Sequence, residues 1–112
     1  MIRFHAFAFL SIAFTVPGFA DSARTYTNPV YSGDMPDPTV LSWQGVYYAM
    51  GTTGNKRTDN GRIFTLLRST NLVDWQNLGG ALIPPSHNPA YQYWAPEATH
   101  MGGKFYVYYA MG

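Results

Sequence analysis

Asp37 carries the side chain best placed to do chemistry, because a proline lies on each side of it. Pro38 pushes the residue before it out of the helical region toward β or polyproline conformations, and Pro36 stiffens the approach from the other side. A carboxylate on such a rigid backbone, at the mouth of a strand expected from Thr39, suits general-base catalysis, which needs fixed placement. A turn is the alternative reading, since Asp before Pro commonly begins one.

Short β-strands must position Asp37, because the patterned segments are rich in β-branched or aromatic residues and are bounded by Gly, Pro or Asn. We find no convincing helix. We expect three hairpins, one across Gln44-Gly45, one around the turn near Asn71 and one across Gly102-Gly103. The strands are predicted at 39–43 and 46–52, at 64–69 and 75–78, and at 97–101 and 104–110. Residues 54–61 and 84–93 are predicted to be loops.

The first and third hairpins repeat one pattern. In both, a Pro is followed seven residues later by a Gly, and an aromatic pair begins two residues after that Gly. Two matching hairpins with one further strand pair between them indicate a repeated four-stranded unit, as in a propeller blade. The chain would hold one complete blade and half of the next. A closed propeller needs at least four blades, so we expect a chain truncated at its C-terminus.

Residues 1–20 have the layout of a secretory signal peptide, with a basic start, an apolar run from Ala6 to Val16 and small residues at Gly18 and Ala20. We expect cleavage before Asp21, which leaves the domain 21–112 in a secreted or periplasmic location. The apolar run has about 11 residues where a membrane span needs roughly 20, so a retained anchor is the less favoured alternative.

Charge and composition exclude several classes of function. Seven Lys or Arg against six Asp or Glu give no electrostatic footprint for nucleic acid or a membrane surface. The sequence has no Cys, and His87 and His100 are isolated from carboxylates, so no metal site is indicated. It also has no Gly-x-Ser-x-Gly elbow and no phosphate-binding loop. The nine Tyr and three Trp suit either a cleft for a polar ligand or a β-rich core.

The order and spacing of several motifs resemble glycoside hydrolase family 43, from Asn28 to the last residue. Similar to the family's first blade are Asn28-Pro29-Val30, Asp34-Met35-Pro36-Asp37-Pro38-Thr39-Val40 and Gly45-Val46-Tyr47-Tyr48. The segment from Ser69 to Trp75 resembles the turn that closes this blade, and Tyr93-Trp94-Ala95-Pro96-Glu97 resembles the opening of the second. The resemblance implies an all-β fold that is the N-terminal portion, about one and a half blades, of a five-bladed β-propeller.

The same resemblance implies hydrolysis of O-glycosidic bonds in arabinan, xylan or arabinoxylan with inversion of the anomeric centre. Asp37 matches the family's general base. The general acid, a Glu in the third blade, and the Asp that tunes it, in the second, would both lie beyond Gly112. Glu97 is the only Glu in the chain, and its place in the motif does not match that acid. Because one carboxylate cannot be both acid and base, we expect the 112-residue chain alone to be inactive.

Trp94 and Glu97 are candidate substrate-binding residues, because the innermost strand of the second blade would begin near the central pocket. An indole can cover the apolar face of a sugar. The alternatives are packing of Trp94 between blades and pairing of Glu97 with Lys104 or Arg68. Trp43 and Trp75 are assigned to packing. No cofactor is indicated. Some family members hold a calcium ion on the propeller axis, but no ligands for it are visible in this sequence.

Two other functions stay open. Retaining, fructosidase-like propeller enzymes also begin with an Asp-Pro motif, but they use that Asp as a nucleophile. The prolines around Asp37 and the Trp94-Ala95-Pro96 motif favour family 43 over these enzymes. The other alternative is a non-catalytic carbohydrate-binding propeller, which only the presence of the general acid would distinguish, since fold does not settle function.

Overall fold

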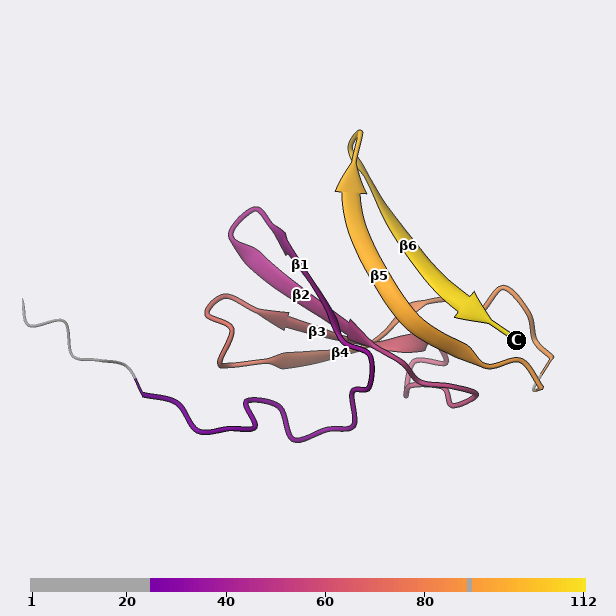
Figure 1. Ribbon diagram of the computed structural model, residues 1–112, viewed down its shortest axis with the longest axis horizontal. Helices are drawn as coiled ribbons and strands as arrows, with labels where there is room; N and C mark the ends of the chain where they lie inside the picture. Colours follow the sequence, from indigo (N-terminus) through magenta and orange to yellow (C-terminus); the bar gives the residue numbers. More distant parts are fainter. Residues whose placement is uncertain (1–24, 89) are drawn as a thin grey trace, which may run out of the picture.

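The structure, a computed structural model, describes residues 25–88 and 90–112, and this part of the chain is all-β, as predicted. Strands β1 (Thr39–Trp43), β2 (Val46–Gly51), β3 (Ile63–Ser69) and β4 (Gln76–Leu82) form an antiparallel sheet in sequential order. Strands β5 (Tyr93–Met101) and β6 (Lys104–Met111) form a separate hairpin (Figure 1). No helix long and apolar enough to cross a membrane occurs among these described residues. The predicted signal peptide lies outside them.

The two glycine-containing hairpin turns have the same backbone shape. The φ angles are 49° and 75° at Gln44 and Gly45, and 58° and 74° at Gly102 and Gly103. Positive φ at both central residues is what a type I′ turn requires, and the twist of that turn matches the twist of the strands it joins. The repeat seen in the sequence is therefore a repeat of hairpin structure.

Strands β4 and β5 are longer than predicted, whereas the other four agree to within one residue. The strand predicted at 75–78 runs from Gln76 to Leu82, because Gly79 and Gly80 stay in the sheet where the loop that leads into β3 passes close by. A Cβ on Gly80 would collide with Thr58 Oγ1.

The strand predicted at 97–101 begins at Tyr93, inside the predicted loop. A bulge between Trp94 and Glu97 takes up the irregular Ala95-Pro96 pair, and a bulge is one of the few places in a sheet that tolerates proline.

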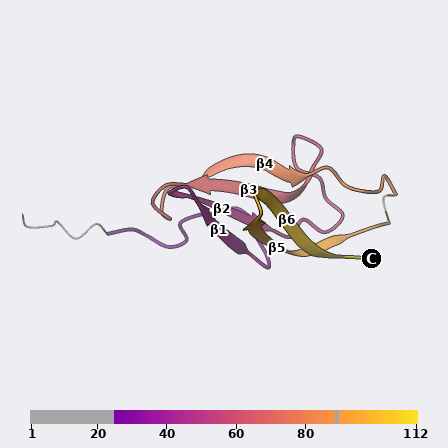
Figure 2. The ribbon, with the colours of Figure 1, turned by 90° about the horizontal axis from the view of Figure 1, so that it is seen from above.

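The hairpin packs against the four-stranded sheet through β5, which contacts β1, β2 and β3. Figure 2 shows β5 beside β1 and β2, with β4 at the far edge of the sheet. The buried core joins both sheets and consists of Met50, Ile63, Phe64, Tyr93 and Ala98. Removal of this apolar area from water, at about 25 cal/mol per Å², is what holds the two sheets together.

Aromatic rings strengthen this contact at both ends of the β6 strand. The Tyr109 ring centre lies 5.2 Å from that of Phe64 in the other sheet, and 6.1 Å from that of Tyr93 in its own hairpin. Near the hairpin tips, Trp43 meets Phe105 edge to face at 5.1 Å, which agrees with its assignment to packing. Such tilted and edge-to-face pairs are the favoured arrangements of aromatic rings.

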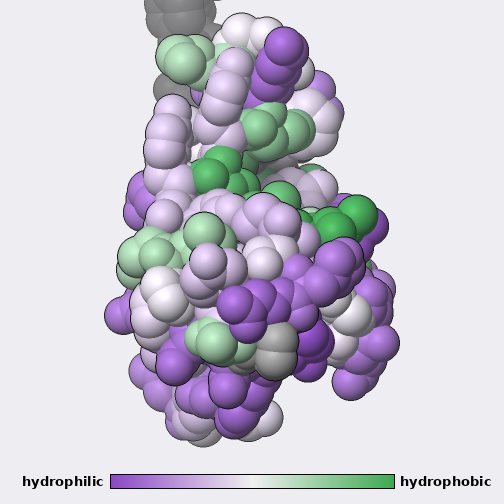
Figure 3. Space-filling model, turned by 90° about the vertical axis from the view of Figure 1, so that its right-hand side faces the viewer, coloured by the Kyte–Doolittle hydropathy of each residue, from purple (hydrophilic) through white to green (hydrophobic). Residues whose placement is uncertain are grey.

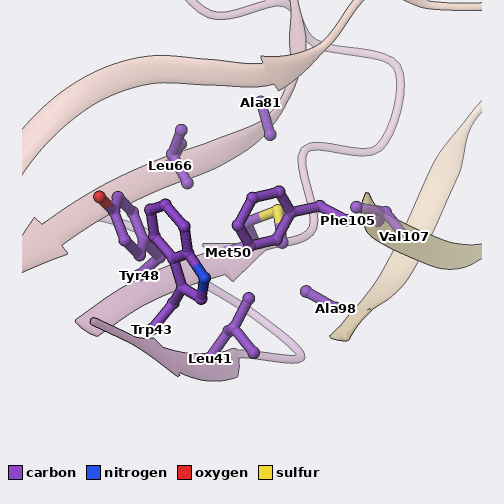
Figure 4. A pocket seen from close by; sticks show the side chains of 9 residues that line it. All are labelled: Leu41, Trp43, Tyr48, Met50, Leu66, Ala81, Ala98, Phe105 and Val107. Atoms are coloured by element: carbon purple, nitrogen blue, oxygen red, sulfur yellow. The ribbon is translucent and has the colours of Figure 1, made fainter. Parts of the chain in front are cut away.

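Between the sheets lies an open apolar hollow of about 380 Å³ (Figure 4). Side chains from both sheets point into it, namely Leu41, Trp43, Tyr48, Met50, Leu66, Ala81, Ala98, Phe105 and Val107. Figure 3 shows that hydrophilic residues cover most of the lower half of one face, while hydrophobic residues gather in its middle and upper part. Because the hollow is apolar and Asp37 does not line it, we assign it to packing.

We predict that Ile63→Ala lowers the free energy of unfolding by about 2–5 kcal/mol, because Ile63 is fully buried between the sheets and its removal leaves a cavity. Ile83 is a matched control, since its side chain is 72% exposed, and Ile83→Ala should change the value by less than about 0.5 kcal/mol. Urea denaturation of the chain measures both, and equal losses in the two variants would contradict the described core.

Candidate active site

Asp37 lies on the surface, two residues before β1, and its φ angle is 48°. The expectation that Pro38 would hold it in a β or polyproline conformation is therefore wrong. Asp is several-fold enriched among the residues that adopt positive φ, so its side chain tolerates this region better than most. The local preference of a residue before proline is outweighed here by contacts to the strand opposite.

Those contacts come from Thr52. Its hydroxyl Oγ1 donates a hydrogen bond of 2.8 Å to Asp37 Oδ2, and its backbone N–H donates one of 2.9 Å to the carbonyl oxygen of Pro36. Thr52 directly follows β2, and the register that sets Thr39 opposite Met50 sets Asp37 opposite Thr52 when it is continued two residues further. One residue therefore holds both the carboxylate and the backbone that leads to it.

The second hairpin reaches the same hydroxyl through Ala95. The Ala95 N–H donates a hydrogen bond of 2.7 Å to Thr52 Oγ1. Ala95 precedes Pro96 as Asp37 precedes Pro38, and its φ angle is also 48°. A non-glycine residue in this region costs roughly 1–3 kcal/mol, and such strain concentrates at functional sites. The equivalent residues of the two hairpins are thus both strained and both bound to one threonine.

The residues after Thr52 complete the link between the sheets. Thr53 Oγ1 accepts a hydrogen bond of 3.2 Å from the backbone N–H of Phe64 in β3. Gly54 and Tyr93 exchange two backbone hydrogen bonds, of 3.2 and 3.1 Å, which join the segment to the start of β5. We call residues 52–54 the strap. We call residues 35–38, just before β1, the Asp37 loop. The strap binds the Asp37 loop, β3 and β5 in turn.

Gly51, the last residue of β2, lets the Asp37 loop lie against the sheet. A Cβ at this position would collide with Met35 Cγ and would come within 3.1 Å of the Pro36 carbonyl oxygen. Gly51 is buried and its φ is not positive, so the requirement for glycine is one of space and not of backbone conformation. The approach of residues 35–36 to β2 therefore depends on the missing side chain.

Trp94 and Glu97 lie on either side of the bulge in β5. Trp94 is half-buried, pairs with Ala110 and packs near Gly112, where an added Cβ would lie 3.4 Å from the indole Cζ3. Glu97 is exposed and pairs with Tyr108. Within residues 25–88 and 90–112, neither side chain forms a hydrogen bond to Asp37, so their roles in substrate binding stay predictions. In that same part of the chain no three His, Cys, Asp or Glu side chains group as metal ligands would.

Sequence reasoning missed Thr52, which was expected only as the last residue of a strand. The signal that could have found it is the hairpin itself. A two-residue turn at Gln44-Gly45 fixes the register, and that register sets Thr52 opposite Asp37. The bond from Ala95 could not be found in this way, since it joins residues of different sheets.

Comparison with known proteins identifies the family. The model of glycosyl hydrolases family 43 matches residues 26–112, so the chain belongs to this family. Among solved structures, a thermostable family-43 glycoside hydrolase is 36% identical and covers 76% of this chain, with a TM-score of 0.62. The family 43 protein BlXynB of Bacillus licheniformis is 26% identical over 75% of the chain, with a TM-score of 0.56. The native arabinanase Arb43A of Bacillus subtilis covers 71% at 24% identity, with a TM-score of 0.57.

The chain spans only part of these proteins. It corresponds to 27% of the length of the thermostable glycoside hydrolase, 28% of the arabinanase and 17% of BlXynB. The matched residues therefore correspond to one section of these structures. Asp37, its loop and the strap belong to that section.

We predict that Gly51→Ala frees the Asp37 loop from β2, because the new methyl group takes the space of Met35 and crowds the Pro36 carbonyl. Hydrogen exchange of the Thr52 amide, which donates to that carbonyl, should become selectively faster than exchange of the β3 amides. Gly45→Ala is the control, since its φ of 75° strains an alanine but no atom lies within 4 Å of the added Cβ. The same exchange pattern in both variants would contradict the steric role of Gly51.

Proposed function

We propose that this chain supplies the general base, Asp37, of an inverting glycoside hydrolase. The observation that carries the proposal is the hold on the Asp37 carboxylate. It sits in the family's first motif, exposed to solvent, with one oxygen fixed by Thr52 and its backbone fixed through Pro36. A general base must be within hydrogen-bond reach of the proton it removes, so a fixed and solvent-accessible carboxylate suits this role.

In the proposed reaction, an Asp37 oxygen takes a proton from a water molecule while the water oxygen bonds to the anomeric carbon. The glycosidic carbon–oxygen bond breaks on the opposite face of the sugar, and the departing oxygen takes a proton from a second carboxyl group. Inverting enzymes set the two carboxyl groups about 6.5–9.5 Å apart so that this water fits between them. Since Glu97 does not match the acid's motif, the acid is proposed to come from a part of the enzyme outside these 112 residues.

The proposed substrates are polysaccharides or oligosaccharides that contain arabinose or xylose, such as arabinan, xylan and arabinoxylan. Membership of family 43 supports this class. The family match also favours this function over the retaining, fructosidase-like alternative. Trp94 is proposed to stack on a sugar ring, and Glu97 to donate or accept hydrogen bonds at the same pocket.

The proposed architecture is a five-bladed β-propeller, with the four-stranded sheet as its first blade and β5–β6 as half of its second. The sequential strand order β1-β2-β3-β4 and the face-to-face contact with β5 support this arrangement, because propeller blades are four-stranded sheets packed around a centre. The family resemblance allows a structural calcium ion on the axis, and no step of the proposed reaction depends on it.

We predict that Asp37→Asn, in a polypeptide that joins this chain to the remaining length of a family 43 enzyme, lowers kcat by about 10²–10⁴-fold, the usual contribution of a general base. The KM should change little, because the amide keeps the shape of the carboxylate. Asp34→Asn is the matched control, three residues earlier in the same exposed segment, and should keep its activity. Hydrolysis of aryl arabinofuranosides and xylosides measures both.

Three outcomes would contradict the proposal in different ways. Full activity of Asp37→Asn would show that another group is the base. Turnover by the 112-residue chain alone would show that a second carboxyl group within it suffices. Binding of arabinan or xylan oligosaccharides without hydrolysis by the longer polypeptide would point to the non-catalytic carbohydrate-binding propeller.

A further inference from the structure

The hydroxyl of Thr52 is bound on both sides, and this fixes the direction of its proton. A threonine hydroxyl has one hydrogen to donate and two lone pairs to accept with. The Ala95 N–H, which has no accepting capacity, occupies a lone pair at 2.7 Å. The hydrogen is thereby left for the one acceptor at 2.8 Å on the other side, Asp37 Oδ2.

The two hydrogen bonds reinforce each other. A hydroxyl that accepts from an N–H becomes a better donor, and a bond donated to an ionised carboxylate is among the stronger kinds in proteins. Both atoms at the ends of this chain belong to residues in strained backbone conformations, with φ at 48°. The hydroxyl therefore sits at a place where two otherwise unfavourable conformations are held together.

From this geometry we propose that Thr52 is a positioning residue for the general base, and the inference rests on the function proposed above. Thr52 holds Asp37 through Oδ2, while within the described residues Oδ1 forms no hydrogen bond. Oδ1 is then the oxygen presented to the attacking water. A threonine at this place converts a mobile surface carboxylate into one with a single orientation.

The arrangement also makes the carboxylate sensitive to the second sheet. The Ala95 N–H belongs to β5, whereas Asp37 and Thr52 belong to the first hairpin and its flanks. The orientation of the Thr52 hydroxyl, and through it the Asp37 rotamer, therefore depends on β5 being docked. Contact between the two sheets therefore adds to the hold on the base.

Three variants of the chain test this inference, with the Asp37 side-chain rotamer read from NMR three-bond couplings and the Ala95 N–H from hydrogen exchange. Thr52→Val keeps the β-branched shape but removes the hydroxyl. In this variant the Asp37 side chain should average over several rotamers, and hydrogen exchange of the Ala95 amide should become faster. Thr52→Ser keeps a hydroxyl and should restore both readouts. Thr53→Val is the matched control, because it removes a neighbouring hydroxyl that accepts from Phe64 and leaves Asp37 in one rotamer.

Activity of the longer polypeptide gives the second readout. Thr52→Val should lower kcat about ten- to a hundredfold with little change in KM, as expected for the loss of a hydrogen bond to a charged group or a misplacement near 1 Å. Thr52→Ser should recover most of this loss, and Thr52→Val should have no further effect in the Asp37→Asn background.

The possible failures are distinguishable. An Asp37 side chain that keeps one rotamer in Thr52→Val would overturn the inference whatever the activity. A loss of kcat that Thr52→Ser does not recover would also overturn it and make Thr52 a purely structural residue. A wild-type polypeptide without glycosidase activity would overturn the proposed function instead, while the rotamer measurement would still decide whether Thr52 orients the carboxylate.

Discussion

The strap, residues 52–54, is the constraint on which the rest of the structure depends. Its three consecutive residues form hydrogen bonds to three different segments. Thr52 bonds to the Asp37 loop, Thr53 to β3 and Gly54 to the start of β5. The buried apolar core supplies most of the attraction between the sheets, but hydrophobic contact has no preferred direction. The directional hydrogen bonds of Thr52 and Gly54 to β5 select one alignment of β5 beside β2, and with it the surroundings of the carboxylate.

This alignment includes backbone conformations that the local sequence disfavours. Asp37 and Ala95 each precede a proline and each have a φ of 48°, at a cost of roughly 1–3 kcal/mol per residue. Hydrogen bonds in proteins contribute about 0.5–1.5 kcal/mol each, and about 1.5–3 kcal/mol when a partner is charged. The bonds from Thr52 and Ala95 are of the size needed to offset that strain. Packing and hydrogen bonding together thus hold a catalytic candidate where its own dipeptide would not place it.

The features that could be predicted are those set by neighbouring residues. Gln44-Gly45 and Gly102-Gly103 fix two hairpin turns, and β-branched and aromatic residues give the strands they join. The role of Asp37, which the motif around it indicates, stays a prediction. The ends of β4 and β5 were missed for two reasons. The β4 glycines are accommodated by the close approach of the loop before β3, and the β5 proline is accommodated by a bulge opposite β6. The conformation of Asp37 and the link from Ala95 were missed because each depends on a contact between segments far apart in the sequence.

We propose Asp37 as a base that activates water and not as a nucleophile that attacks the sugar. Thr52 holds Oδ2, and within the described residues Oδ1 forms no hydrogen bond and can face the water molecule that an inverting reaction requires. The most direct test is the anomeric configuration of the first product, followed by proton NMR during hydrolysis of an arabinoside or xyloside by the longer polypeptide. We predict that the first-formed sugar has the configuration opposite to that of the substrate. A first product with the same configuration as the substrate would contradict it and would make Asp37 a nucleophile.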